Sequence, residues 1–423
     1  MKYSLSSDTW DKEELQAIQD VIDSGRYTMG PKVAQFEKEF AEKFDVPYAV
    51  MVNSGSTANL LMWSCLVNRD QLHGDVIVPA VSWSTTYFPL LQNRFTPNFV
   101  DVDLDTLNLD VTKIEEAITE DTVAIFAVNL LGNSCDYSKI LKLCKKYKLE
   151  LIEDNCESLG AISNVTFAEG NSIKVRKCGT VGRMGSFSFF FSHHMQTMEG
   201  GMIACWDKDD YDFLRSLRAH GWCRDLPEEN NLYDKSGDPF IDSFTFVTPG
   251  YSVRPLEMSG AIGSVQLKKC DKFIEERRNN AKYFVDKFSK LPNIKIQKEI
   301  GKSSWFCFSI ILTDELQSER DVVIERLTKI GVETRPIIAG NFMKQPVIEY
   351  FTYIGRATYD SADYLHDNGF FMGNDVIDLK ENIDMVYDEF VKINHDYKND
   401  KLRQDMLNES LGLKDHTNDS EMI

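Results

Sequence analysis

The sequence lacks the excess of positive charge and the long apolar run that mark several classes of protein. Its 423 residues include 47 Lys and Arg against 66 Asp and Glu, which gives a formal net charge of −19. Because a nucleic-acid-binding protein needs a basic face, this balance argues against a nucleic-acid partner. No apolar run reaches the roughly 20 residues of a membrane span, and the polar N-terminus shows no secretory signal. We therefore expect no membrane partner.

The sequence also lacks a repeated Cys-x-x-Cys pattern, although it contains nine cysteines. An odd number of irregularly spaced cysteines in a long chain is typical of reduced thiols, not of a disulfide framework. These features predict a cytoplasmic protein. A hydrophobic content of 43% and a charged content of 27% are ordinary for a globular enzyme.

Helical and apolar segments alternate along the chain. An amphipathic helix is expected in 8–24, and from about residue 48 short apolar strands alternate with helices over about 200 residues. This alternation predicts an α/β fold with a mainly parallel sheet covered by helices. We expect a large domain in 1–270, a smaller C-terminal α/β domain in 271–398 and a polar tail in 399–423.

Two polar turns follow predicted strands. The segment "NSGSTANLL" (53–61) is a Gly/Ser turn that enters a helix, where free backbone amides can hold a phosphate. The segment "LIEDNCESLGA" (151–161) places Asp154 and Glu157 just past an apolar strand, at the edge of a parallel sheet where ligands bind. Taken singly, an ordinary turn and a solvated acidic turn explain these segments equally well.

The segment "SFSFFFSHHMQTMEGG" (186–201) is expected to be a buried strand that leads to two adjacent histidines. Ser188 and His193 would then project near one another from the strand end. A metal site at His193 and His194 is disfavoured, because side chains of adjacent residues diverge and helical chelation uses residues i and i+4. A catalytic base and a packed structural histidine both remain open.

Six segments, in this order, resemble the DegT/DnrJ/EryC1/StrS family of sugar aminotransferases, which are pyridoxal-phosphate enzymes of fold-type I. They are "NSGSTANL", "VPAVSWSTT", "IEDNCESLGA", "GSFSFFFSHHMQTMEGGMI", "GYSVRPLEMSGAIGSVQL" and "RPIIAGNFMKQP". The resemblance implies a large domain with a mainly parallel central sheet, a smaller C-terminal domain and a homodimer with its site at the subunit interface.

The same resemblance implies which residues bind the cofactor, pyridoxal 5'-phosphate: Gly55, Ser56, Trp83, Asp154, Glu157 and Ser188. Gly55, Ser56 and Ser188 match the positions that bind the cofactor phosphate, and Trp83 matches the one that stacks on the pyridine ring. Asp154 matches the carboxylate that pairs with the protonated pyridine nitrogen, so that the ring can accept electrons.

One position departs from the aminotransferase pattern. His193 stands where those enzymes have the lysine that binds the cofactor covalently, and no lysine occurs between Lys177 and Lys208. Imidazole forms no stable imine, so the cofactor is expected to bind non-covalently, as pyridoxamine 5'-phosphate. This replacement is typical of the nucleotide-sugar 3-dehydratase branch. His193 is then the expected base, with a pKa near neutrality, and His194 a supporting or packing residue.

That branch removes the C3 hydroxyl from a nucleotide-linked 4-keto-6-deoxyhexose and releases ammonia, toward deoxysugars such as those of lipopolysaccharide O-antigen. Its members restore the cofactor amine with L-glutamate, or else use an iron–sulfur cluster and an electron donor. A cluster needs four close thiolates, but the corresponding region has only Cys223 before Cys270. We therefore expect the L-glutamate-dependent type.

Four arginines are candidates for binding a diphosphate or a carboxylate, with surface salt bridges as the alternative: Arg218, Arg224, Arg254 and Arg335. The family usually has an asparagine that reaches the phosphate from the partner subunit, where this chain has Ser252. Two other functions stay open. One is a sugar aminotransferase that returns an amino sugar, and the other is a catalytically silent binding or regulatory homologue.

Overall fold

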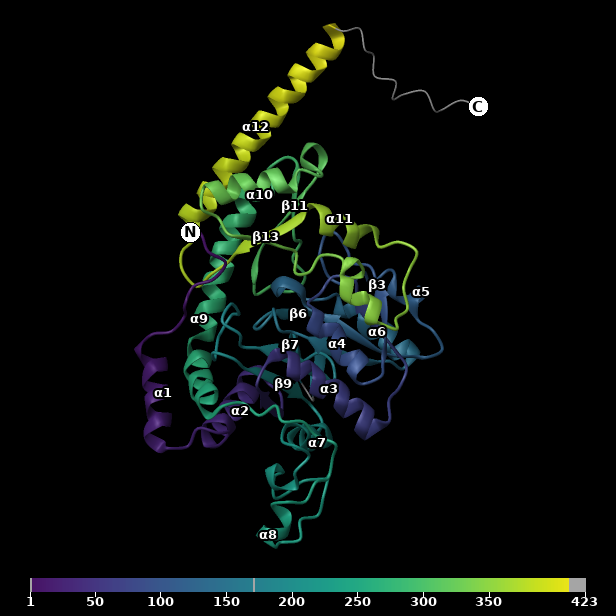
Figure 1. The fold of residues 1–423 in the computed structure, drawn as a ribbon, viewed down its shortest axis with the longest axis vertical. Helices are drawn as coiled ribbons and strands as arrows, with labels where there is room; N and C mark the ends of the chain where they lie inside the picture. Colours follow the sequence, from purple (N-terminus) through teal and green to yellow (C-terminus); the bar gives the residue numbers. More distant parts are fainter. Residues whose placement is uncertain (1, 170–171, 411–423) are drawn as a thin grey trace.

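The larger of two main sheets has seven strands (Figure 1). The structure is a computed structural model that describes residues 2–169 and 172–410. In spatial order the strands are β1 (Tyr48–Val52), β9 (Gly201–Cys205), β8 (Met184–Ser188), β5 (Glu150–Asp154), β4 (Thr122–Val128), β2 (Asp75–Pro79) and β3 (Thr96–Val100). The strands from β8 to β3 are parallel, and only β9 runs antiparallel to its neighbours. The predicted mainly parallel sheet is confirmed.

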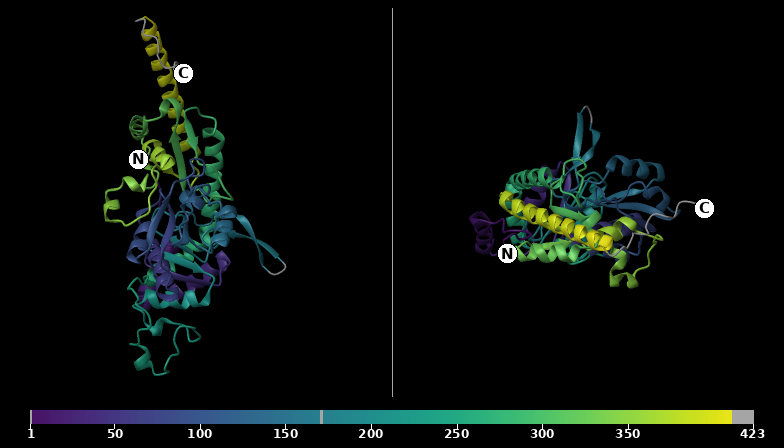
Figure 2. Two further views of the ribbon diagram at one scale, coloured as in Figure 1. Left: turned by 90° about the vertical axis from the view of Figure 1, so that its right-hand side faces the viewer. Right: turned by 90° about the horizontal axis from the view of Figure 1, so that it is seen from above.

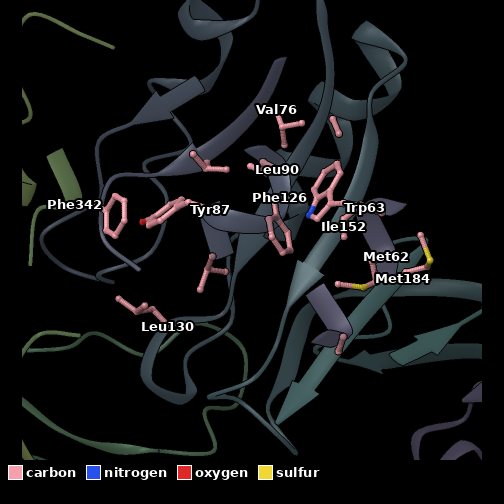
Figure 3. Close-up of a cluster of buried hydrophobic side chains, with 14 of the residues drawn as sticks. Met62, Trp63, Val76, Tyr87, Leu90, Phe126, Leu130, Ile152, Met184 and Phe342 are labelled. Carbon is pink, nitrogen blue, oxygen red and sulfur yellow. The ribbon is translucent and has the colours of Figure 1, made fainter. Parts of the chain in front are cut away.

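Helices cover both faces of this sheet. Successive strand residues point to opposite sides, and apolar side chains on both sides pack against helices. In β1, Val50 and Val52 face a core shared with α3 (Gly55–Asp70), α4 (Ser84–Gln92) and α7 (Lys208–Arg218). The intervening Ala49 and Met51 face α2 (Pro31–Phe44) and α9 (Glu257–Phe288). Figure 3 shows the first core, where Trp63 meets Phe126 edge-on with ring centroids 5.2 Å apart.

Further elements lie around the large sheet. They are α1 (Lys12–Ser24), α5 (Ile114–Ala117), α6 (Tyr137–Tyr147), α8 (Pro239–Asp242) and the short 3-10 helices η1 (Leu130–Gly132) and η2 (Cys223–Asp225). The predicted helix 8–24 thus begins at Lys12, after a capping box formed by Asp11 and Glu14. Strands β6 (Ile162–Glu169) and β7 (Ser172–Lys177) pair as an arm that projects from the body (Figure 2). Within the described residues, no helix is long and apolar enough to cross a membrane.

The second sheet is antiparallel, in the order β10 (Ile294–Ile296), β11 (Cys307–Leu312), β13 (Gly369–Gly373) and β12 (Thr334–Pro336). One face packs on α9, α10 (Arg320–Lys329) and α12 (Lys380–Ser410), where Phe284 and Phe308 stack with centroids 4.5 Å apart. The other face turns Cys307 and Phe371 toward the core of the large sheet. Connecting segments include α11 (Asp360–Asn368) and the 3-10 helices η3 (Asp314–Leu316), η4 (Phe342–Lys344) and η5 (Pro346–Tyr350).

The two predicted domains share elements. Helix α9 runs without a break across the predicted boundary at residue 270. The N-terminal segment joins the second sheet, because Tyr3 pairs with Val332 and its hydroxyl donates to the carbonyl of Gly373 at 2.6 Å. Of the predicted tail 399–423, the first part continues α12 as far as Ser410, and 411–423 lie outside the described residues.

A short connection that precedes β11 fastens the second sheet to the first. The Ser304 amide donates to the carbonyl of Gly132 at 2.9 Å, and the Phe306 amide donates to that of Leu131 at 3.2 Å. Gly132 has φ +93°, and a Cβ there would lie 2.5 Å from the nitrogen of Trp305. Only glycine therefore permits this approach.

We predict that Gly132→Ala destabilises the protein by about 3 kcal/mol, because it adds a backbone clash to left-handed strain. Gly237→Ala is the matched control, since Gly237 has φ +79° with nothing within 4 Å of its Cβ position. The control should cost only about 1 kcal/mol, the strain alone. Urea unfolding followed by circular dichroism measures both losses. Equal losses would show that the contact with Trp305 has no energetic weight.

Candidate active site

A cavity of about 360 Å³ lies at the carboxyl edge of the large sheet, where the second sheet meets it. Side chains from both sheets line it, among them Phe306, Cys307 and Phe371. Eight of the ten predicted site residues also line it: Gly55, Ser56, Trp83, Asp154, Glu157, Ser188, His193 and Arg335. The fold thus brings together residues that are up to 280 positions apart.

The turn after β1 forms one end of the cavity. Ser54 caps α3, since its hydroxyl accepts from the Thr57 amide at 3.1 Å, and the helix begins at Gly55. A Cβ at Gly55 would lie 2.6 Å from the Cβ of Ser188, the last residue of β8. The glycine therefore lets the helix start and Ser188 approach closely. First-turn amides and hydroxyls arranged in this way bind phosphate.

Asp154 ends β5 and is almost fully buried. One carboxylate oxygen accepts from Asn59 Nδ2 at 2.9 Å and from Thr86 Oγ1 at 2.8 Å, and the other from the Cys156 amide at 3.2 Å. These donors orient the carboxylate in the cavity wall. Sequence reasoning did not single out Asn59 or Thr86, although both fall within the matched segments "NSGSTANL" and "VPAVSWSTT".

Glu157 holds its carboxyl beside that of Asp154. Burial, with a smaller contribution from the nearby Asp154 charge, raises the pKa of Glu157 to about 8. The Leu131 amide donates to Oε2 at 3.0 Å and offsets the rise only in part. Near pH 7 the group is therefore mainly a neutral carboxylic acid, which can donate as well as accept a hydrogen bond.

His193 follows the end of β8 by five residues, on a turn closed by its amide and the Phe190 carbonyl at 2.9 Å. The predicted strand thus ends before the histidines. The imidazole lies edge-on to the rings of Phe190 and Phe306, with centroids 6.2 and 5.4 Å away. Its buried Nδ1 has no hydrogen-bond partner among the described residues.

The predicted pKa near neutrality for His193 is wrong for the protein without bound molecules. Burial, and after it the positive charge of Arg277, lower the pKa to about 4, although the Phe190 carbonyl opposes the change. Both effects disfavour the imidazolium ion. At pH 7 the imidazole is therefore neutral and able to accept a proton.

His194 points away from the cavity into the protein. It is fully buried, its Nε2 lies 3.0 Å from the carbonyl of Ser304, and burial lowers its pKa well below the ordinary value. This is the position of a packing residue. Among the described residues, no group of three or more His, Cys, Asp or Glu could hold a metal ion.

The candidate arginines separate in the structure. Arg335 lines the cavity, with its side chain 60% exposed. Arg224 and Arg254 lie outside it, with their guanidinium groups 3.5 and 5.6 Å from the ring centroid of Trp222. Arg218 is buried in an ion pair with a glutamate of α2, so the binding role considered for it is wrong.

The sheet order, the phosphate-type turn and the buried carboxylate at the strand edge define an α/β enzyme of the aminotransferase fold. The chain belongs to the DegT/DnrJ/EryC1/StrS aminotransferase family, whose sequence profile matches residues 8–376. The resemblance inferred from the six segments is confirmed.

Relatives of known function are similar over nearly the whole chain. GDP-4-keto-6-deoxy-D-mannose 3-dehydratase of Yersinia pseudotuberculosis is 50% identical over 92% of this chain and 98% of its own. Two solved structures of GDP-4-keto-6-deoxymannose 3-dehydratase are each 48% identical and cover 92% of this chain and 100% of theirs. One holds a trapped PLP-glutamate geminal diamine (TM-score 0.87), and the other, a histidine-to-asparagine variant, holds GDP-perosamine (TM-score 0.86).

We predict that Glu157→Gln stabilises the protein increasingly as the pH rises from 5 to 8. The neutral acid contributes stability that is complete below the unfolded-state pKa and is lost as the pH rises through about 8. The amide has no such loss, so its advantage should grow by at least about 1 kcal/mol, the equivalent of one pKa unit.

Urea unfolding of the ligand-free protein at several pH values measures this difference. Glu116→Gln is the control, because Glu116 lies exposed on α5. The control should track the original protein at every pH. Parallel curves for Glu157→Gln and the original protein would contradict a raised pKa.

Proposed function

We propose that this chain is a pyridoxamine phosphate-dependent 3-dehydratase that acts on a GDP-linked 4-keto-6-deoxyhexose. One observation carries the proposal. His193, neutral and with a free Nδ1, faces the cavity after β8, and no lysine of the described residues lines that cavity. An aminotransferase of this family needs a lysine there. A dehydratase needs only a residue that removes a proton, and this residue can be a histidine. The 3-dehydratase relatives, about half identical over most of this chain, support the same reaction.

The residues of the cavity fit the cofactor. The close approach of Gly55 and Ser188 makes a phosphate cradle at the start of α3. Trp83, which is 58% exposed at the cavity, offers a flat face for the pyridine ring. Asp154, oriented by its three donors, would pair with the pyridine nitrogen. Glu157, as a neutral acid, would donate a hydrogen bond to an oxygen of the cofactor.

When bound, pyridoxamine phosphate supplies an amine that condenses with the C4 ketone of the sugar and a ring that accepts electrons. His193 accepts a proton from the cofactor carbon that bears the amine, because its imidazole is neutral at pH 7. The same imidazolium then returns a proton to the departing C3 hydroxyl, which leaves as water. Phe190 and Phe306 border the imidazole and reduce the water around it.

L-Glutamate restores the amine of the cofactor in this proposal. The relative that contains a trapped PLP-glutamate adduct supports this assignment. Arg335 is the cavity arginine that would bind a carboxylate of glutamate or the sugar diphosphate, since a guanidinium pairs with either anion through two parallel hydrogen bonds.

The first experiment combines the protein with pyridoxal phosphate, L-glutamate and GDP-, CDP- or dTDP-linked 4-keto-6-deoxyhexoses. We expect ammonia release and loss of the C3 hydroxyl with the GDP sugar, measured by an ammonia assay and mass spectrometry. An amino sugar as product would replace the proposal with an aminotransferase. No reaction and no change in cofactor absorbance with glutamate would favour a silent homologue.

In the same assay, His193→Lys should lower dehydration by about a hundredfold or more, because the base is lost. The new amine can also bond the cofactor aldehyde covalently, which gives a new absorbance band that borohydride removes. His73→Lys is the matched control, since His73 lies exposed in the loop after α3. It should behave like the original protein, and full activity of His193→Lys would contradict the assigned role.

We also propose that two copies of this chain associate through the segment around α8, which projects from the body in Figure 1. Phe240, Phe244 and Phe246 of this segment are 82%, 68% and 59% exposed. Such a group of exposed aromatic side chains is typical of an interaction surface. In a dimer, Arg224 and Arg254, which lie outside their own cavity, could serve the cavity of the other copy.

Light scattering should give twice the mass of the chain for the original protein. Phe240→Glu combined with Phe244→Glu should give the mass of one chain, because the charges cannot be buried in the interface. Val391→Glu, at an exposed apolar position on α12, is the control and should stay dimeric. A dimer that survives the double change would place the interface elsewhere.

A further inference from the structure

Arg277 lies in α9 and is only 2% exposed. The charge of Asp375 favours its guanidinium, but burial outweighs this effect, and its Nε lacks a hydrogen-bond partner among the described residues. Burying a guanidinium costs free energy that one nearby carboxylate offsets only in part. General stability is therefore a poor explanation for this residue, and its contacts indicate another role.

The guanidinium joins the ends of two strands of the second sheet. Its Nη1 donates to the carbonyl of Phe306, just before β11, at 3.1 Å and to that of Asn374, just after β13, at 2.5 Å. The side-chain Nδ2 of Asn374 donates in turn to the carbonyls of Arg277 at 3.0 Å and Trp305 at 2.8 Å. The backbone that carries Phe306 is thus held from α9 and from β13.

Phe306 is the side chain that this arrangement presents to the active site. Its ring centroid lies 5.4 Å from that of His193 and 5.8 Å from that of His194. His194 fastens the same segment through the carbonyl of Ser304 at 3.0 Å. The wall beside the proposed base therefore depends on Arg277 and His194 together.

We propose that Arg277 is a positioning residue for the reaction at His193: it anchors Phe306, whose ring holds the imidazole in the cavity, and its buried charge opposes a charged imidazole. The proposal deepens the proposed function and rests on it for its kinetic consequences. The geometric and electrostatic parts concern the ligand-free protein and are testable without turnover.

Other titratable or charged groups line the same cavity as His193. They are Asp154 and Glu157 at the end of β5, Glu199 after the histidines, Cys307 of β11 and Arg335 of β12. Those carboxyl groups that are ionised favour the imidazolium, whereas the arginines oppose it. Among these charges, that of Arg277 acts on His193 most strongly, which makes it the one to remove.

The test is an NMR titration of the imidazole signals in ligand-free protein with labelled histidine, in which His193→Asn identifies the signal of His193. Arg277→Met removes the charge, and we expect it to raise the pKa of His193 by about one unit or more. Arg277→Lys keeps the charge, so the pKa should stay within about half a unit of the original. The exposed His73 should titrate identically in all samples.

Kinetics adds a second measurement. In Arg277→Met the acid limb of the pH profile of kcat/KM should move upward with the NMR pKa. Phe306→Leu keeps the charge but removes the ring, so we expect kcat to fall about tenfold, with KM unchanged.

Equal titrations of His193 in the Met and Lys variants would overturn the electrostatic part, whether or not the enzyme is a dehydratase. If Arg277→Met does not fold, as judged by circular dichroism, Phe306→Leu decides the anchoring role. An unchanged kcat in that variant overturns it. Absence of any dehydratase activity in the original protein, with the expected NMR shift, would instead reject the proposed function and keep the inference.

Discussion

The attachment of Ser304–Phe306 to Leu131 and Gly132 is the contact on which the active site depends. It brings the second sheet over the carboxyl edge of the first, at a point where only a glycine allows the backbones to meet. The same segment carries the ring beside His193, and the Leu131 amide that meets Glu157 belongs to the same turn. The same contacts therefore close the cavity and orient Glu157 and His193 within it.

Burial sets the chemistry of the cavity by acting oppositely on its two kinds of titratable group. It removes the charge from Glu157 by raising the pKa and from His193 by lowering it. An acid that keeps its proton and a base that lacks one then stand in a single pocket at pH 7. In the proposed reaction this division lets His193 accept a proton from carbon while Glu157 donates a hydrogen bond.

Much of the fold and of the site was predictable because the motifs are local. A glycine-serine turn after β1, a carboxylate after β5 and a histidine after β8 reach one edge, since parallel strands share their carboxyl ends. Asn59, Thr86 and Phe306 were not singled out, because they act through contacts between segments far apart in the chain. Arg277, in the middle of a long helix, shows no local pattern at all, and only the fold places it behind the pocket.

The sequence by itself determined the missing lysine, the histidine in its place and the cofactor motifs, because each is a matter of residue type and order. The tertiary structure alone decided that His193 is neutral and that His194 packs inward, because desolvation depends on everything that surrounds a side chain. It also put Arg335 in the cavity and left Arg224 and Arg254 outside it. These arginines carry the same charge, but each can bind only what the packing of the chain places beside it.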